Sequence, residues 1–180
     1  KSRDLKTWEP MGLVWSFAKN ATWQKGQSDR DGKIEKRAIW APELHYFKGT
    51  YWLPYCLNYD KGGTGILKSE SGKPEGPYVD VKKDGPVTGE IDSSLFADDD
   101  GAIYLVWQNG KIAKMKDDMS GLAEEPRHLK PANADQVGFE AASIAKINGR
   151  YHLICADWGK WDGKTKTYDC MAASAENIYG

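Results

Sequence analysis

The sequence contains no long hydrophobic run, no excess of basic residues and few cysteines. No stretch approaches the ~18 consecutive apolar residues that a membrane-spanning helix requires, so we expect no membrane span. Lysine and arginine number 25 against 26 aspartates and glutamates, which leaves a net charge of −1. Because a nucleic-acid-binding surface needs a basic stripe, this balance excludes nucleic acid as an expected partner.

Cysteine and histidine are also scarce, and their spacing predicts no metal site. Cys56, Cys155 and Cys170 do not have the spacing of metal ligands, and the three histidines are scattered. We expect the thiols to be buried and free, packing as small apolar residues. Cys155 and Cys170 both lie in strand-like segments, so a disulfide between neighbouring strands is the alternative.

Helical periodicity is weak, whereas short strand-like segments recur. No long window repeats apolar residues every 3.6 positions, and glycine and proline interrupt the chain often. Three segments share a short apolar stretch, a turn containing glycine and an aromatic-rich strand; they are 41–56, 93–108 and 142–157. Each is followed by a third strand-like segment, at 63–71, 110–118 and 168–176.

The turn glycines of these segments, Gly49, Gly101 and Gly149, are about 50 residues apart. A repeat of this period with several short strands is typical of a β-propeller blade. We therefore predict an all-β fold, a β-propeller of which about three to four blades are present. The expected organisation is the end of a first blade and a loop (1–37), two blades (38–88 and 89–137) and an incomplete blade (138–180).

A propeller closes as a ring of at least about four blades, so we expect this chain to be truncated at both ends. Each blade needs its neighbours to bury its apolar faces. The remaining blades would come from missing sequence or from another chain. The isolated chain of 180 residues is accordingly expected to be unstable.

Two carboxylates and an indole stand at the beginnings of the predicted blades. Asp92 precedes the apolar stretch that starts at Leu95, Glu140 precedes Ile144, and Trp40 stands in the corresponding region of the blade before. The innermost strands of a propeller run along its axis, so residues at one end of these strands converge on one pocket. Paired acids beside an aromatic wall suit glycosidic bond cleavage, in which one carboxyl group protonates the leaving oxygen.

Each of these residues also has a structural interpretation. Asp92 could cap a turn by bonding to its own backbone, which Asp-Ser-Ser sequences favour. Glu140 could be an exposed loop residue, and Trp40 could pack in the core. The aspartates at 98–100 are expected to be solvated residues of a hairpin tip, because Asp-Gly between apolar runs favours a tight turn.

These motifs resemble those of glycoside hydrolase family 43. The similarity covers essentially the whole chain, through "SRDLKTWE" (2–9), "WAPEL" (40–44), "IDSSLFADDDG" (91–101) and "GFEAASI" (138–144). The resemblance implies a five-bladed β-propeller and an inverting, mostly exo-acting glycosidase of arabinofuranosides and xylosides in plant polysaccharides. It also implies that Glu140 is the general acid, that Asp92 orients this acid and tunes its pKa, and that Trp40 lies near the sugar subsite.

The resemblance further implies what this chain lacks. The family's catalytic base is an aspartate at the start of the first blade, upstream of a segment like 2–9, and Asp4 is not a substitute for it. An inverting enzyme needs that base roughly 6.5–9.5 Å from the acid, while a carboxylate near Glu140 disfavours the ionisation of Glu140. No cofactor is identified, although the resemblance allows a calcium ion in the central channel.

The expected partner is therefore an oligosaccharide or polysaccharide, and a secreted or periplasmic location follows from this substrate class alone. A non-catalytic carbohydrate-binding propeller is the first alternative, because it needs the aromatic pocket but no base. A purely structural interaction propeller is the second alternative. Two acids at corresponding strand starts argue against it, since an interaction surface does not need them.

Overall fold

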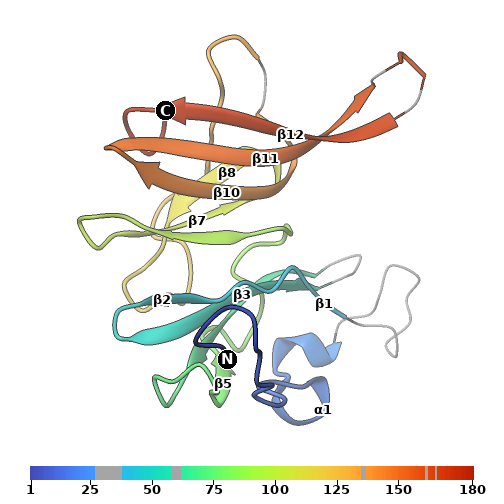
Figure 1. The fold of residues 1–180 in the computed structure, drawn as a ribbon. Helices are drawn as coiled ribbons and strands as arrows, with labels where there is room; N and C mark the ends of the chain where they lie inside the picture. The colour runs from blue at the N-terminus through green and yellow to red at the C-terminus, as the bar shows by residue number, and fades with distance from the viewer. Residues whose placement is uncertain (27–37, 58–61, 135–136, 161, 165) are drawn as a thin grey trace.

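The computed structural model describes residues 1–26, 38–57, 62–134, 137–160, 162–164 and 166–180. Its regular structure is almost entirely antiparallel β (Figure 1). The described helical elements are short: α1 spans Phe17–Asn20, and the 3-10 helices η1 and η3 span Trp23–Gly26 and Gln108–Gly110. The predicted all-β class is confirmed.

Three antiparallel sheets follow one another along the chain. The first sheet contains β1 (Ile39–Trp40), β3 (Thr50–Leu57), β4 (Gly63–Ser69) and β5 (Tyr78–Asp80), with β2 (His45–Phe47) paired to β3. The second sheet contains β6 (Ser94–Ala97), β7 (Ile103–Trp107), β8 (Lys111–Lys114) and β9 (Arg127–His128). The third sheet contains β10 (Glu140–Ile147), β11 (Arg150–Lys160) and β12 (Lys166–Ala175).

These sheets lie within the ranges 38–88, 89–137 and 138–180. In the range 1–37, for which the sequence predicts the end of a first blade and a loop, the described residues 1–26 contain α1 and η1 but no strand. The rest of that range, 27–37, lies outside the described residues.

The predicted turn glycines lie in the β2–β3, β6–β7 and β10–β11 connections. Gly49, Gly101 and Gly149 have φ angles of 72°, 83° and 76°, a backbone region that glycine enters without steric cost. Lys48 and Asn148, which precede two of these glycines, also have positive φ. The β2–β3 and β10–β11 connections are therefore two-residue turns that match the twist of their strands.

The sheets stack face to face in chain order (Figure 1). Every side chain of β7 is buried, and successive residues face opposite neighbours. Leu105 packs in a cluster with Trp52 of the first sheet, whereas Val106 packs in a cluster with Leu153 of the third sheet. The uninterrupted apolar run of β7 thus reflects a strand with both faces in a core.

Residues 15–24 cover the remaining face of the first sheet. Trp23 stacks on Tyr55 with ring centroids 6.4 Å apart, in a cluster that also contains Trp15. Beneath these rings, Gln24 Nε2 and the Tyr55 hydroxyl donate hydrogen bonds to Asp80 Oδ1 at 2.9 and 2.8 Å. Asp80 is buried, so these charge-assisted bonds compensate for the water that its carboxylate loses.

Asp98 contradicts the expectation of a solvated hairpin tip at 98–100. Its side chain is only 10% exposed, and it accepts hydrogen bonds from Lys146 Nζ at 2.7 Å and from the Tyr151 hydroxyl at 2.6 Å. Burial opposes its ionisation, but these two donors and the Asp99 N–H together outweigh burial and lower the pKa of Asp98. Asp98 therefore joins the second sheet to the third, whereas Asp99 and Asp100 are exposed as expected.

Cys170 is a second correction, because it is exposed, whereas Cys56 and Cys155 are buried and free as expected. In the β11–β12 register Cys170 lies opposite Ala156 and Cys155 lies opposite Met171. Alternate residues of a strand face opposite sides of a sheet, so the two thiols point away from each other and form no disulfide. Burial raises the pKa of Cys155 to about 11.

Asp98→Asn is expected to lower the free energy of unfolding by about 2 kcal/mol, because it weakens two hydrogen bonds to a shielded charge. Urea denaturation of the complete gene product, with and without the substitution, measures the difference. The folded-state pKa of Asp98 is lowered, so its contribution is complete above the ordinary aspartate pKa of about 4 and decreases as the pH falls further.

Asp99→Asn is the matched control for this substitution. The Asp99 side chain is 83% exposed, although it also contacts Lys146, and exposed ion pairs contribute little. Equal losses for the two variants would contradict the assignment of Asp98 as the connection between the sheets.

Candidate active site

One strand-start position recurs in all three sheets. Trp40 lies opposite Cys56 at the start of the first sheet, and Glu140 lies opposite Ala156 at the start of the third. Ile91 holds the same place in the second sheet, where its carbonyl accepts a hydrogen bond from the N–H of Gln108, directly after β7, at 3.2 Å. Trp40 and Glu140 are therefore equivalent positions of the repeat.

The residue that follows this position has a positive φ in every sheet. The angle is 46° at Ala41, 57° at Asp92 and 51° at Ala141. Residues other than glycine adopt this conformation at a cost, although aspartate tolerates it better than most. Asp92 thus stands one position later in the repeat than Glu140, and the two carboxylates occupy consecutive rather than equivalent positions.

Asp92 is held by the segment that connects the first two sheets. The carbonyl of Glu90 accepts a hydrogen bond from Thr64 Oγ1 at 2.9 Å, and the Glu90 carboxylate accepts one from Trp107 Nε1. Cys56 Sγ lies 4.0 Å from Asp92 Oδ1 and donates to the Trp40 carbonyl at 3.5 Å. These contacts place the backbone of Trp40 and the carboxylate of Asp92 around one thiol.

Asp92 and Glu140 interact electrostatically. Burial raises the pKa of Asp92, and the charge of Glu140 raises it further, while a hydrogen bond from the Ala141 N–H acts in the opposite direction. Two carboxylates that repel in this way disfavour the state in which both are ionised. The structure therefore brings together the two acids that the sequence analysis selected.

The backbone around Glu140 is fixed on two sides. The Phe139 N–H donates to the Ala156 carbonyl at 3.0 Å, and the Phe139 carbonyl accepts from the Asn109 N–H of η3 at 2.9 Å. The β10–β11 register shifts between Glu140 and Ser143. Such an irregularity redirects a side chain at the end of a strand.

Trp40 is 44% exposed, so a large part of its side chain is accessible to solvent. Glu43, three residues later in the same motif, instead connects the first sheet to the second. Its carboxylate accepts hydrogen bonds from Ser94 Oγ at 2.7 Å and pairs with His45 Nε2 at 2.8 Å. Burial opposes ionisation of Glu43, but these partners outweigh burial and lower its pKa.

Sequence reasoning did not select Tyr168, whose hydroxyl donates a hydrogen bond to Glu140 Oε2. Trp158, which is 57% exposed, lies opposite Tyr168 in the β11–β12 register. Both residues stand in the two-stranded arm that β11 and β12 form beyond the start of β10 (Figure 1). The alternating apolar residues in the segment 142–157 indicated a strand, but no local signal shows that β12 reaches Glu140.

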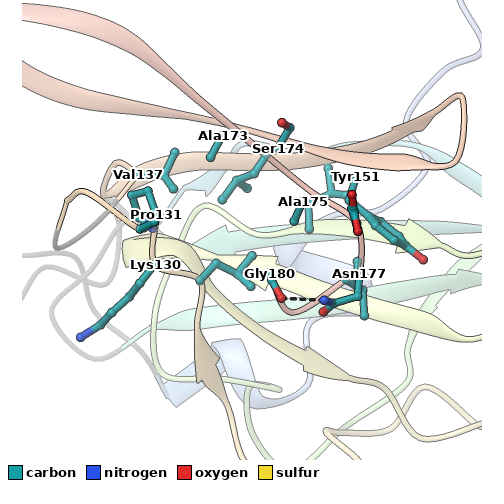
Figure 2. A pocket seen from close by; sticks show the side chains of 15 residues that line it. Lys130, Pro131, Val137, Tyr151, Ala173, Ser174, Ala175, Asn177 and Gly180 are labelled. Carbon is teal, nitrogen blue, oxygen red and sulfur yellow. Dashed lines mark hydrogen bonds between the residues drawn. The ribbon is translucent and has the colours of Figure 1, made fainter.

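A separate pocket of about 460 Å³ lies away from these acids (Figure 2). Its lining includes Leu129, Pro131, Val137, Leu153 and Ala173, and it contains none of Trp40, Asp92 and Glu140. It is mostly apolar and has no pair of carboxylates. It is therefore not part of the candidate active site.

Side chains that commonly bind metal ions do not cluster among the described residues. Among them, no group of three or more histidines, cysteines, aspartates or glutamates is placed to hold a metal ion. The described part of the chain also contains no helix that is long and apolar enough to cross a membrane.

The family model "Glycosyl hydrolases family 43" matches residues 1–180. The chain belongs to this family. An α-L-arabinofuranosidase of Clostridium thermocellum has a TM-score of 0.72 to this chain at 23% identity, with 98% of this chain and 56% of that chain covered. The family 43 structures that match are five-bladed β-propellers, which confirms the predicted fold class.

Curated members of family 43 match along most of this chain. A β-D-galactofuranosidase of Aspergillus niger is 28% identical over 178 residues, which cover 88% of this chain and 48% of its own length. A xylosidase/arabinosidase of Humicola insolens is also 28% identical, over 99% of this chain and 34% of its own length. The chain thus spans half or less of these two family members.

Glu140→Gln is expected to lower the pKa of Asp92, because it removes the neighbouring charge and leaves the burial of Asp92 unchanged. A carbon-13 NMR titration of the complete gene product, labelled at aspartate carboxyl carbons, measures this pKa, with the resonance assigned by its loss in Asp92→Asn.

Glu176→Gln is the matched control, since Glu176 is an exposed carboxylate that pairs with Arg150. An Asp92 pKa that stays the same in Glu140→Gln would contradict the electrostatic coupling of the two acids.

Proposed function

We propose that the protein containing this chain is an inverting, exo-acting glycoside hydrolase that cleaves arabinofuranosyl or xylosyl linkages of plant polysaccharides. The observation that supports this most is the electrostatic coupling of Asp92 and Glu140 at neighbouring strand starts. The names of family members support the substrate class, since they include a xylosidase/arabinosidase and an extracellular arabinanase of Bacillus subtilis.

In this proposal Glu140 is the general acid. Its protonated carboxyl group donates to the glycosidic oxygen as the bond to the sugar breaks, and water attacks from the opposite side of the ring. Asp92 orients this acid and modulates its proton affinity, because repulsion between the two carboxylates disfavours the doubly ionised pair.

Trp40 is proposed to contact the sugar. Its exposed indole presents an apolar face, and its backbone lies next to the thiol that also contacts Asp92. A flat aromatic surface of this kind suits the apolar face of a sugar ring.

The catalytic base is not assigned to any residue of this chain. Asp4 is a turn residue, because its Oδ1 accepts hydrogen bonds from the Lys6 and Thr7 N–H groups, both at 2.9 Å. We infer that residues 1–180 are part of a propeller domain whose base and remaining pocket walls lie in further sequence or in another chain. A secreted or periplasmic location belongs to the same proposal, in line with the extracellular enzymes among its relatives.

Glu140→Gln in the complete gene product is expected to lower kcat/KM on arabino- or xylo-oligosaccharides by about 10²–10⁴-fold, because general acid catalysis contributes that much. The loss should be smaller on nitrophenyl glycosides, whose leaving group needs little protonation. Glu176→Gln, at the exposed partner of Arg150, should leave the rate unchanged. A Glu140→Gln variant with the parent's activity on oligosaccharides would contradict the assignment of the acid.

The isolated chain of 180 residues is expected to hydrolyse none of these substrates, because no residue in it is assigned the role of base. A discontinuous assay that detects released reducing sugar, run beside the complete gene product, tests this. Turnover by the isolated chain would contradict the inference that the catalytic base lies outside it. An inert gene product that still binds arabinan or xylan oligosaccharides would instead support a carbohydrate-binding propeller.

A further inference from the structure

Tyr168, on β12, contacts the proposed general acid directly. Its hydroxyl donates a hydrogen bond to Glu140 Oε2. Glu140, Ala156 and Cys170 lie side by side across the three strands of the third sheet. Tyr168 stands two residues before Cys170, so its side chain lies on the same face of the sheet as Glu140.

Two aromatic rings hold the Tyr168 side chain. Its ring centroid lies 4.9 Å from Trp158 and 6.3 Å from Phe139, with interplanar angles of 62° and 84°. Trp158 is the cross-strand partner of Tyr168, and Phe139 directly precedes Glu140. Rings that pack edge-on in this way restrict the rotamer of Tyr168 and keep its hydroxyl directed at the carboxylate.

Tyr168 remains a hydrogen-bond donor over the working pH range of an enzyme. Burial raises the pKa of Tyr168, and the hydrogen bond to Glu140 and the charges of Glu140, Asp92 and Asp157 raise it further. Lys166, on the same strand, lies over the Trp158 ring at 5.7 Å from its centroid. The charges near the phenol are therefore mainly those of carboxylates, which disfavour its ionisation.

We propose that Tyr168 is a positioning residue that orients Glu140 for proton donation. The inference rests on the proposed function. A hydrogen bond to Oε2 leaves Oε1 as the oxygen that carries the transferable proton, and so sets the direction from which the glycosidic oxygen is protonated.

The same hydrogen bond acts during the reaction. The proton moves from Glu140 to the glycosidic oxygen, which takes the electron pair of the breaking bond to the sugar. Water supplies the oxygen of the new bond and loses a proton to the base. Glu140 becomes a carboxylate in this step, and the Tyr168 donor stabilises the charge that develops on it.

Tyr168→Phe in the complete gene product removes only the hydroxyl. We expect kcat on aryl glycosides with poor leaving groups to fall about 10-fold or more, the effect of losing a hydrogen bond to a charged group. Dinitrophenyl glycosides, which need little protonation, should lose little. KM should change little, since the hydroxyl bonds to Glu140 rather than to the sugar.

The pH–rate profile of Tyr168→Phe provides a second readout. The alkaline limb should move to higher pH, because ionised Glu140 loses a donor that favours its charge. Tyr46→Phe, which removes the hydroxyl of another exposed tyrosine, is the matched control. Equal losses on all leaving groups with an unchanged profile would overturn the positioning role.

An NMR experiment tests the contact without activity. The complete gene product is labelled with 3-fluorotyrosine, and the Tyr168 fluorine resonance is identified by its loss in Tyr168→Phe. Its shift should follow a carboxyl titration at acidic pH, and this titration should disappear in Glu140→Gln but persist in Glu176→Gln. A resonance that ignores Glu140→Gln overturns the proposal. A coupled resonance in an inactive gene product shows the contact but overturns the proposed function, and with it the role in proton donation.

Discussion

The packing of the second sheet between its two neighbours is the constraint on which the candidate site depends. β7 buries Leu105 against the first sheet and Val106 against the third, so neither neighbour can shift without opening a cavity. The strand starts are tied to these sheets by the hydrogen bond between Asn109 and Phe139 and by the contacts around Glu90. Residues that are distant in the sequence, Asp92 and Glu140, thereby interact with each other.

Asp98, Glu43 and Asp92 have two contrasting electrostatic environments. Asp98 and Glu43 have donors that compensate for burial, and the pKa of each is lowered. Asp92 has the opposite environment, because burial and Glu140 raise its pKa. The first environment stabilises contacts between sheets, whereas the second keeps a repulsive pair at the strand starts. Such a pair costs stability, and its retention is expected where chemistry requires a proton.

Much of the fold follows from short-range patterns. The turns at Gly49, Gly101 and Gly149 were predictable because only a few residue types accept a positive φ between antiparallel strands. Asp98 was placed wrongly, because the Asp-Gly signal fixes the turn but not what packs beside it; Lys146 and Tyr151 of the next repeat remove it from water. Cys170 was placed wrongly for a related reason, since strand periodicity does not tell which face of a sheet has a neighbour.

The sequence by itself determined the repeat, the all-β class and the family, and it singled out Asp92, Glu140 and Trp40. These features depend on local backbone preferences and on motif order, which the chain carries without folding. Only the tertiary structure decided that Asp92 stands one position after Glu140 in the repeat and that Tyr168 reaches Glu140 across the third sheet. Register between strands and packing between sheets set these relations, because both depend on residues that meet only when the chain folds.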